Sequence, residues 1–88
     1  MNPFRSSATP RFWERLNRLP ADIQDQAFAQ YTLFEENPYH PSLRFKQTGD
    51  YWSARITRGY RALAVRDGHS LTWFWIGTHD EYERLLEL

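Results

Sequence analysis

The sequence predicts an α+β fold, in which an N-terminal helical hairpin packs on a mainly antiparallel sheet of about three to five strands, followed by a short C-terminal helix. Three observations predict this fold. Between residues 9 and 36, apolar side chains recur with the period of a helix. From residue 43 the period becomes two, as in strands. Turns at Arg58-Gly59 and Asp67-Gly68 divide the second half into hairpins.

The composition fits a single domain over residues 1–88. Apolar residues make up 41% of the chain and aromatic residues 17%, enough for the dense core that so short a chain requires. The absence of cysteine excludes a disulfide framework and thiolate metal sites. No stretch approaches the ~20 apolar residues of a membrane span. We therefore expect a cytoplasmic protein with no membrane partner.

Two helices are expected in the first half of the chain. Thr9 and Pro10 are typical of an N-cap and of the first helical position, and Pro20 ends this short helix. A second helix is expected from about Ala21 to Glu36, because Asn37-Pro38 stops it. Its apolar stripe consists of Ile23, Ala27, Phe28, Tyr31 and Phe34. The tight link at Pro20 predicts that the two helices pack antiparallel.

The strands are expected at residues 43–46, 52–57, 60–66 and 71–76, with a short edge strand within residues 2–8. The strand at 71–76 is apolar on both faces apart from Thr72, which predicts cover on both sides. Thr78 and Glu81 have the spacing of a capping box and predict a final helix that supplies one of these covers. Period-two spacing predicts core positions for Trp52, Trp73 and Trp75.

Charge is balanced overall but unevenly distributed. Eleven Lys and Arg face eleven Asp and Glu, and the pI of 6.8 gives no support for nucleic-acid binding, which is typical of domains with pI above ~9. Between residues 43 and 66, however, the only acid is Asp50. The basic residues of this segment are Arg44, Lys46, Arg55, Arg58, Arg61 and Arg66. The middle of the chain is therefore a candidate anion-binding surface.

Four residues form the candidate catalytic group: Arg55, Arg61, His79 and Tyr82. They come from neighbouring hairpin strands and the turn after the last strand, so they could converge at one end of the sheet. Arginines hold phosphate, and histidine transfers protons near neutral pH. Such a site would cleave RNA through the 2′-hydroxyl group of the RNA itself. The same residues could instead be solvated strand arginines, a helix-start histidine and a core tyrosine, and pattern alone favours this structural explanation.

Signatures of cysteine nucleophiles, serine hydrolases, phosphate loops and zinc proteases are absent from the sequence. His40, His69 and His79 are widely spaced, whereas a metal needs three or four converging ligands. We therefore expect neither a metal nor another cofactor.

Three segments resemble the RelE/ParE-type toxins of bacterial toxin–antitoxin systems: Tyr51–Thr57, Gly59–Leu63 and Trp75–Tyr82. The resemblance extends over nearly the whole chain. It implies that Arg61 matches the arginine of a Tyr-Arg pair in the ribonuclease branch, and that Arg55, His79 and Tyr82 match other site residues. It also implies a cognate antitoxin as partner, with the ribosome and mRNA as targets. Ser53 departs from the pattern, because a basic residue is usual there.

Three functions follow from the resemblance. The first is a ribosome-dependent mRNA endoribonuclease that inhibits translation, with Arg44, Lys46 and Arg58 as further RNA contacts. The second is a ParE-type toxin that binds DNA gyrase without catalysis. The third is a stand-alone or degenerate protein that keeps the fold and has lost toxicity, as the neutral charge and Ser53 suggest.

Overall fold

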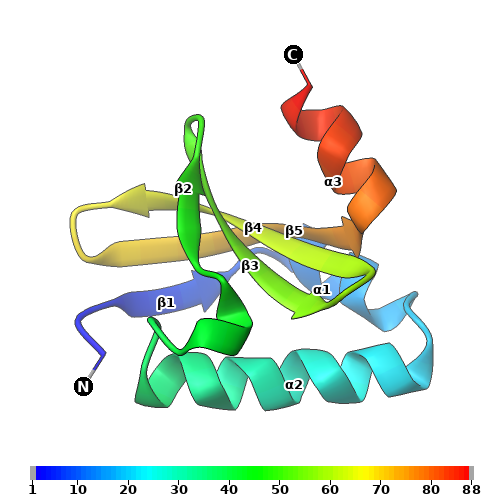
Figure 1. The fold of residues 1–88 in the computed structure, drawn as a ribbon, viewed down its shortest axis with the longest axis horizontal. Helices are drawn as coiled ribbons and strands as arrows, with labels where there is room; N and C mark the ends of the chain where they lie inside the picture. Colours follow the sequence, from blue (N-terminus) through cyan, green and yellow to red (C-terminus); the bar gives the residue numbers. More distant parts are fainter. Residues whose placement is uncertain (1, 88) are drawn as a thin grey trace.

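The computed structural model describes residues 2–87, which form a five-stranded sheet and three α-helices (Figure 1). In chain order the elements are β1 (Arg5–Ala8), α1 (Pro10–Asn17), α2 (Ala21–Glu36), the 3-10 helix η1 (Pro41–Leu43), β2 (Lys46–Thr48), β3 (Tyr51–Thr57), β4 (Tyr60–Asp67), β5 (Ser70–Thr78) and α3 (His79–Leu86). The strand order is β1-β5-β4-β3-β2. Only the pairing of β1 with β5 is parallel. The predicted α+β fold, including its edge strand, is confirmed.

Local signals explain where the helices begin. The Oγ1 atom of Thr9 accepts a hydrogen bond from the backbone N–H of Phe12 at 3.2 Å, which caps α1 as predicted. At the start of α3, Thr78 and Glu81 form both hydrogen bonds of a capping box. The predicted bounds of α2 are confirmed.

The prediction of a strand at residues 43–46 is wrong. The chain first forms η1 and enters β2 only at Lys46. Two local features prevent an extended backbone there. The Nδ1 atom of His40 accepts a hydrogen bond from the N–H of Ser42, which caps the 3-10 turn. Arg44 then adopts a positive φ of 46°, in the left-handed region. Leu43 is buried as expected, but in a helical turn instead of a strand.

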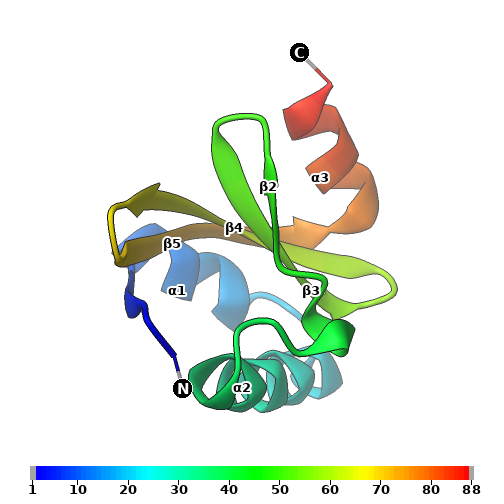
Figure 2. The same ribbon diagram turned by 60° about the vertical axis from the view of Figure 1, so that its left-hand side comes forward.

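The helices lie on opposite faces of the sheet (Figures 1 and 2). On one face, α1 packs against β5 and α2 against β3, and both helices contact the sheet more than they contact each other. On the other face, α3 rises from the end of β5, on the same side as the tip of the β2–β3 hairpin. None of the helices within residues 2–87 has the length and apolar character that a membrane span requires.

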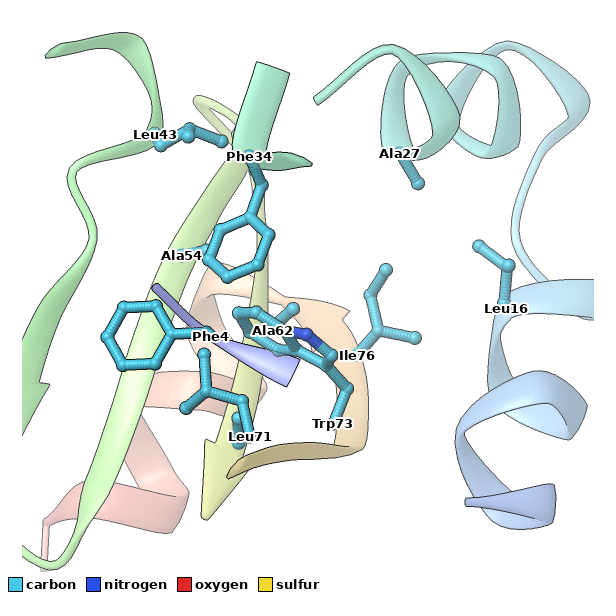
Figure 3. Packing of buried hydrophobic residues seen from close by; sticks show 11 residues of the cluster. Phe4, Leu16, Ala27, Phe34, Leu43, Ala54, Ala62, Leu71, Trp73 and Ile76 are labelled. Atoms are coloured by element: carbon cyan, nitrogen blue, oxygen red, sulfur yellow. The ribbon is translucent and has the colours of Figure 1, made fainter. Parts of the chain in front are cut away.

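The main core lies between the sheet and the pair α1 and α2 (Figure 3). Phe34 of α2 is at its centre, with its ring centroid 5.6 Å from that of Trp73 and 5.4 Å from that of Phe45. Small residues on the central strands, Ala54 and Ala62, leave room for these rings beneath the helices.

A smaller cluster on the opposite face contains Leu63, Trp75 and Tyr82, so the last strand is covered on both sides as predicted. A β-bulge divides its aromatic residues between the faces. Leu63 pairs with Trp75 and Ala64 pairs with Trp73, which leaves Phe74 as the extra residue. Trp73 and Trp75 are both buried, but they point to opposite faces despite their spacing of two. Trp52 is half-buried against the main core.

Part of the predicted apolar stripe of α2 is not in the core. Phe28 is 52% exposed and Tyr31 is 39% exposed, whereas Ala27 and Phe34 are buried. With Trp13 of α1, which is 46% exposed, they line an opening of 250 Å³ between the two helices and β1. We call this opening the apolar groove. It exists because each helix packs on the sheet and not tightly on its partner.

Candidate functional site

Six of the seven residues predicted to act on RNA line one hollow of 390 Å³, on the sheet face that carries α3. They are Arg44, Lys46, Arg55, Arg61, His79 and Tyr82. We call this opening the basic hollow. Strands β2, β3 and β4 form its floor, and α3 forms one wall. Arg58 does not line it and is exposed in the turn between β3 and β4.

Arg55 and Arg61 lie directly opposite each other on β3 and β4. The Nη1 atom of Arg61 donates hydrogen bonds to three carbonyl oxygens of the adjoining turn, those of Thr57 at 2.6 Å, Tyr60 at 2.9 Å and Arg58 at 3.2 Å. These bonds hold the guanidinium in one orientation and leave Nε and Nη2 for other partners. Burial, followed by the charge of Arg55, lowers the pKa of Arg61.

This arginine pair lacks a counter-ion within the described chain. Like charges on directly opposed strand positions destabilise a sheet. Among residues 2–87 the ion pairs are Arg15–Glu81 and His79–Glu83, so neither Arg55 nor Arg61 has a carboxylate within 4.0 Å. Glu83 is close enough to raise the pKa of Arg61, but this effect is smaller than that of burial. An anion between the two guanidinium groups would relieve their repulsion.

His79 is the first residue of α3, and two contacts define its position. Its backbone N–H donates to the carbonyl oxygen of Gly59 at 2.8 Å, which ties the start of α3 to the β3–β4 turn. Its Nε2 atom lies 3.4 Å from Oε1 of Glu83, one helical turn later. With Nε2 beside a carboxylate, Nδ1 is the ring nitrogen left for a ligand.

Tyr82 belongs both to the hollow and to the smaller core cluster. It is only 9% exposed, and its hydroxyl donates to Oγ of Ser53 at 3.2 Å. Ser53 is 2% exposed and lies 3.4 Å from Oγ1 of Thr48, so three hydroxyl groups line the floor in a chain. The phenolic oxygen keeps its lone pairs, and it can therefore accept a hydrogen bond from a ligand.

Five residues of the hollow were not predicted as site residues: Thr48, Ser53, Glu83, Leu86 and Glu87. Ser53 lies two positions before Arg55, so strand alternation already placed both on one face. Glu83 lies four positions after His79, which is the spacing of a helical side-chain pair. Thr48 gave no such signal, because its place depends on the register of β2 against β3. Within residues 2–87 no cluster of His, Asp and Glu could hold a metal ion.

The capping box at the start of α3 should make the stability of the protein depend on pH. The hydrogen bond from the Thr78 N–H, followed by the smaller effect of Arg15, lowers the pKa of Glu81 below its ordinary value. A depressed folded-state pKa stabilises the fold above the unfolded pKa, and the benefit is lost as pH falls through the folded value. We expect Glu81→Gln to lower the unfolding free energy by under about 1 kcal/mol at pH 7. Urea denaturation should show this difference shrinking as pH falls through the folded-state pKa of Glu81, and a difference that stays constant with pH would contradict the assignment.

Comparison with known proteins identifies one family and one fold. A family model described as the ParE-like toxin domain matches residues 21–84. YafQ from E. coli strain BL21(DE3) is 13% identical, with 90% of this chain and 97% of that chain covered and a TM-score of 0.68. The YoeB/ParE toxin from Agrobacterium tumefaciens is 19% identical, with 86% and 99% covered and a TM-score of 0.63.

An archaeal RelE-RelB complex from Pyrococcus horikoshii OT3 contains a chain that is 18% identical, with 89% of this chain and 96% of that chain covered and a TM-score of 0.63. No curated protein sequence matches significantly. At these identities the solved structures establish a shared fold, while the match to residues 21–84 carries the information on family.

Proposed function

The chain belongs to the ParE-like toxin family, of the RelE/ParE type, and on this premise we propose that it is a toxin that cleaves mRNA on the ribosome. The reaction proposed is a metal-independent endoribonuclease cleavage in the basic hollow. The cellular consequence is inhibition of translation in the cytoplasm.

One observation carries this proposal: Arg55 and Arg61 face each other without a carboxylate partner among residues 2–87, in a hollow that also holds His79. Two guanidinium groups can hold a phosphodiester through several charge-assisted hydrogen bonds. Arg44 and Lys46, which are exposed on the same hollow, extend the positive surface for flanking phosphates. Arg58 lies outside the hollow and would contact RNA only beyond the cleaved bond.

Each group has a role in the proposed step. The 2′-oxygen of the RNA attacks the adjacent phosphorus and the bond to the 5′-oxygen breaks, giving a 2′,3′-cyclic phosphate and a 5′-hydroxyl. Arg55 and Arg61 stabilise the negative charge that builds up on the phosphoryl oxygens. His79 donates a proton to the leaving 5′-oxygen. The phenolic oxygen of Tyr82 accepts a hydrogen bond from the 2′-hydroxyl. The proton of this hydroxyl passes to water at the solvent-exposed side of the basic hollow.

The ribosome is proposed as the platform because the chain itself attracts RNA weakly. Its formal net charge is zero, so few counterions would be released when it binds free RNA. A ribosome that presents mRNA in a fixed path would supply the missing positioning.

A cognate antitoxin is the proposed partner, and the apolar groove is the surface proposed to receive it. Trp13, Phe28 and Tyr31 form an exposed apolar patch, and α2, which supplies two of these residues, also carries the exposed acids Asp22 and Asp25. An amphipathic helix with basic flanks matches this surface. One of the solved structures with the same fold is a complex of RelE with RelB, and another such complex comes from Methanococcus jannaschii.

The test is to induce the protein in bacteria and to map RNA ends. Growth arrest is expected, together with new 5′ ends inside translated messages, and purified protein should cut mRNA only when ribosomes are added. Coexpression of the cognate antitoxin should restore growth. Intact transcripts after induction would reject the ribonuclease function.

The family name gives weight to a second function, binding of DNA gyrase, which needs no anion-holding pair. A supercoiling assay with purified gyrase separates the two. Inhibition at micromolar toxin, with mRNA left intact, would favour gyrase, whereas normal supercoiling with cleaved mRNA is the outcome expected here. If neither occurs, the protein has lost toxicity.

A further inference from the structure

We propose that Arg15 of α1 is a positioning residue that fixes the orientation of α3 and thereby holds His79 in place in the basic hollow. This inference rests on the proposed ribonuclease function for its kinetic consequence, but its structural part can be tested independently. Arg15 does not line the hollow, so any effect on the reaction must pass through other residues.

Arg15 makes three different contacts with the far end of the chain. Its Nε donates a hydrogen bond to the carbonyl oxygen of Ile76 at 2.8 Å. Its Nη2 lies 3.3 Å from Oε2 of Glu81, where it forms an ion pair and a hydrogen bond. Its guanidinium carbon lies 5.1 Å from the centroid of the Trp75 ring, in a cation–π contact. One side chain of α1 therefore holds the end of β5 and the first turn of α3 together.

The residues held by Arg15 surround the joint from which His79 emerges. Glu81 is the residue that reaches back to the N–H of Thr78, the N-cap immediately before His79. A Cβ atom added to Gly77 would lie 2.5 Å from Cζ2 of Trp75 and 2.8 Å from Oε1 of Glu81. The indole and the carboxylate are thus closed tightly over this glycine, and Arg15 contacts both. This packing sets the angle at which α3 leaves the sheet.

The chemistry of Arg15 suits this role better than that of lysine. A planar guanidinium can donate to the Ile76 carbonyl and to the Glu81 carboxylate through different nitrogens while it lies over the Trp75 ring. A lysine ammonium is a point charge and can occupy one of these places at a time. The pair of Arg15 with Glu81 alone would contribute little, because exposed ion pairs are weak. It is the combination of three contacts that restrains the joint.

Loss of Arg15 should affect kcat and KM differently, because phosphate binding and proton transfer depend on different elements of the fold. The groups that bind phosphate, Arg55 and Arg61, are on β3 and β4, which Arg15 does not touch. The group that transfers the proton, His79, is on α3. Loss of Arg15 should therefore lower kcat about 10-fold, as for other residues that orient a reacting group, and leave KM within about twofold. A general loss of structure would change both constants.

The experiment compares Arg15→Met with Arg15→Lys and with Arg11→Met as a matched control. Arg11 is one helical turn earlier on α1, is exposed, and makes no side-chain hydrogen bond or ion pair within residues 2–87. The expected result is a roughly 10-fold lower kcat in the ribosome-dependent cleavage assay for Arg15→Met, partial recovery for Arg15→Lys, and wild-type constants for Arg11→Met.

A second measurement needs no catalysis. Amide hydrogen exchange of Glu81 and Tyr82 should be about 10-fold faster in Arg15→Met than in wild type, with shifted ring-proton resonances of His79, while β4 amides remain unchanged. If the wild-type protein cleaves no RNA, the proposed function fails, and the exchange data still decide the role of Arg15. Unchanged exchange and resonances, or equal effects of Arg15→Met and Arg11→Met, would overturn the inference.

Discussion

Arg61→Ala is expected to lower kcat for ribosome-dependent mRNA cleavage by about 100- to 1,000-fold and to abolish growth arrest on induction. Losing one preorganised donor that stabilises charge in a transition state has effects of this size. Arg61 is the more constrained member of the pair, because its Nη1 is bound to three carbonyl oxygens and its guanidinium cannot turn away. Single-turnover cleavage on programmed ribosomes measures the loss directly.

The same three bonds mean that Arg61→Ala also removes a support of the β3–β4 turn. Arg55→Ala separates the two effects, because the Arg55 side chain has no hydrogen bond or ion pair within residues 2–87. We expect Arg55→Ala to lose cleavage with a urea midpoint that is unchanged or slightly raised, because its removal relieves the repulsion with Arg61, whereas Arg61→Ala loses cleavage and some stability. Full activity in a folded Arg55→Ala variant would show that the pair does not hold the scissile phosphate.

Much of this molecule could be predicted because its signals are local. The bounds of α2 and the capping box of α3 depend on residues a few positions apart, and both are confirmed. The convergence of Arg55 and Arg61 required only a short turn and antiparallel pairing. Their catalytic role stays a prediction, since geometry alone does not test it.

Other features depend on contacts between distant residues and leave no local pattern. Alternation along β5 could not reveal that the bulge at Phe74 turns Trp73 and Trp75 to opposite faces. Helical spacing placed Phe28 in the apolar stripe of α2, but its exposure follows from how far α2 lies from α1. The contact between Arg15 and Glu81 joins residues 66 positions apart. Such pairs become visible only when the fold brings the elements together.

Gly77→Ala is expected to lower the unfolding free energy by about 1 to 3 kcal/mol, the usual effect of overpacking. The new Cβ would meet Trp75 at 2.5 and 2.8 Å and Oε1 of Glu81 at 2.8 Å. The carboxylate can rotate away, at the expense of the capping box. The indole is held more firmly, because it is 9% exposed, packs in the smaller core cluster and lies under Arg15.

Gly59→Ala is the matched control, since a Cβ there meets no atom within 4 Å and Gly59 does not have a positive φ. It should change the unfolding free energy by less than about 0.5 kcal/mol. For a domain of this size, Gly77→Ala should lower Tm by roughly 4 to 8 °C for each kcal/mol lost. Equal melting temperatures of the two variants would mean that Trp75 moves aside freely. Because α3 carries His79, that freedom would also remove the rigid joint on which the positioning by Arg15 depends.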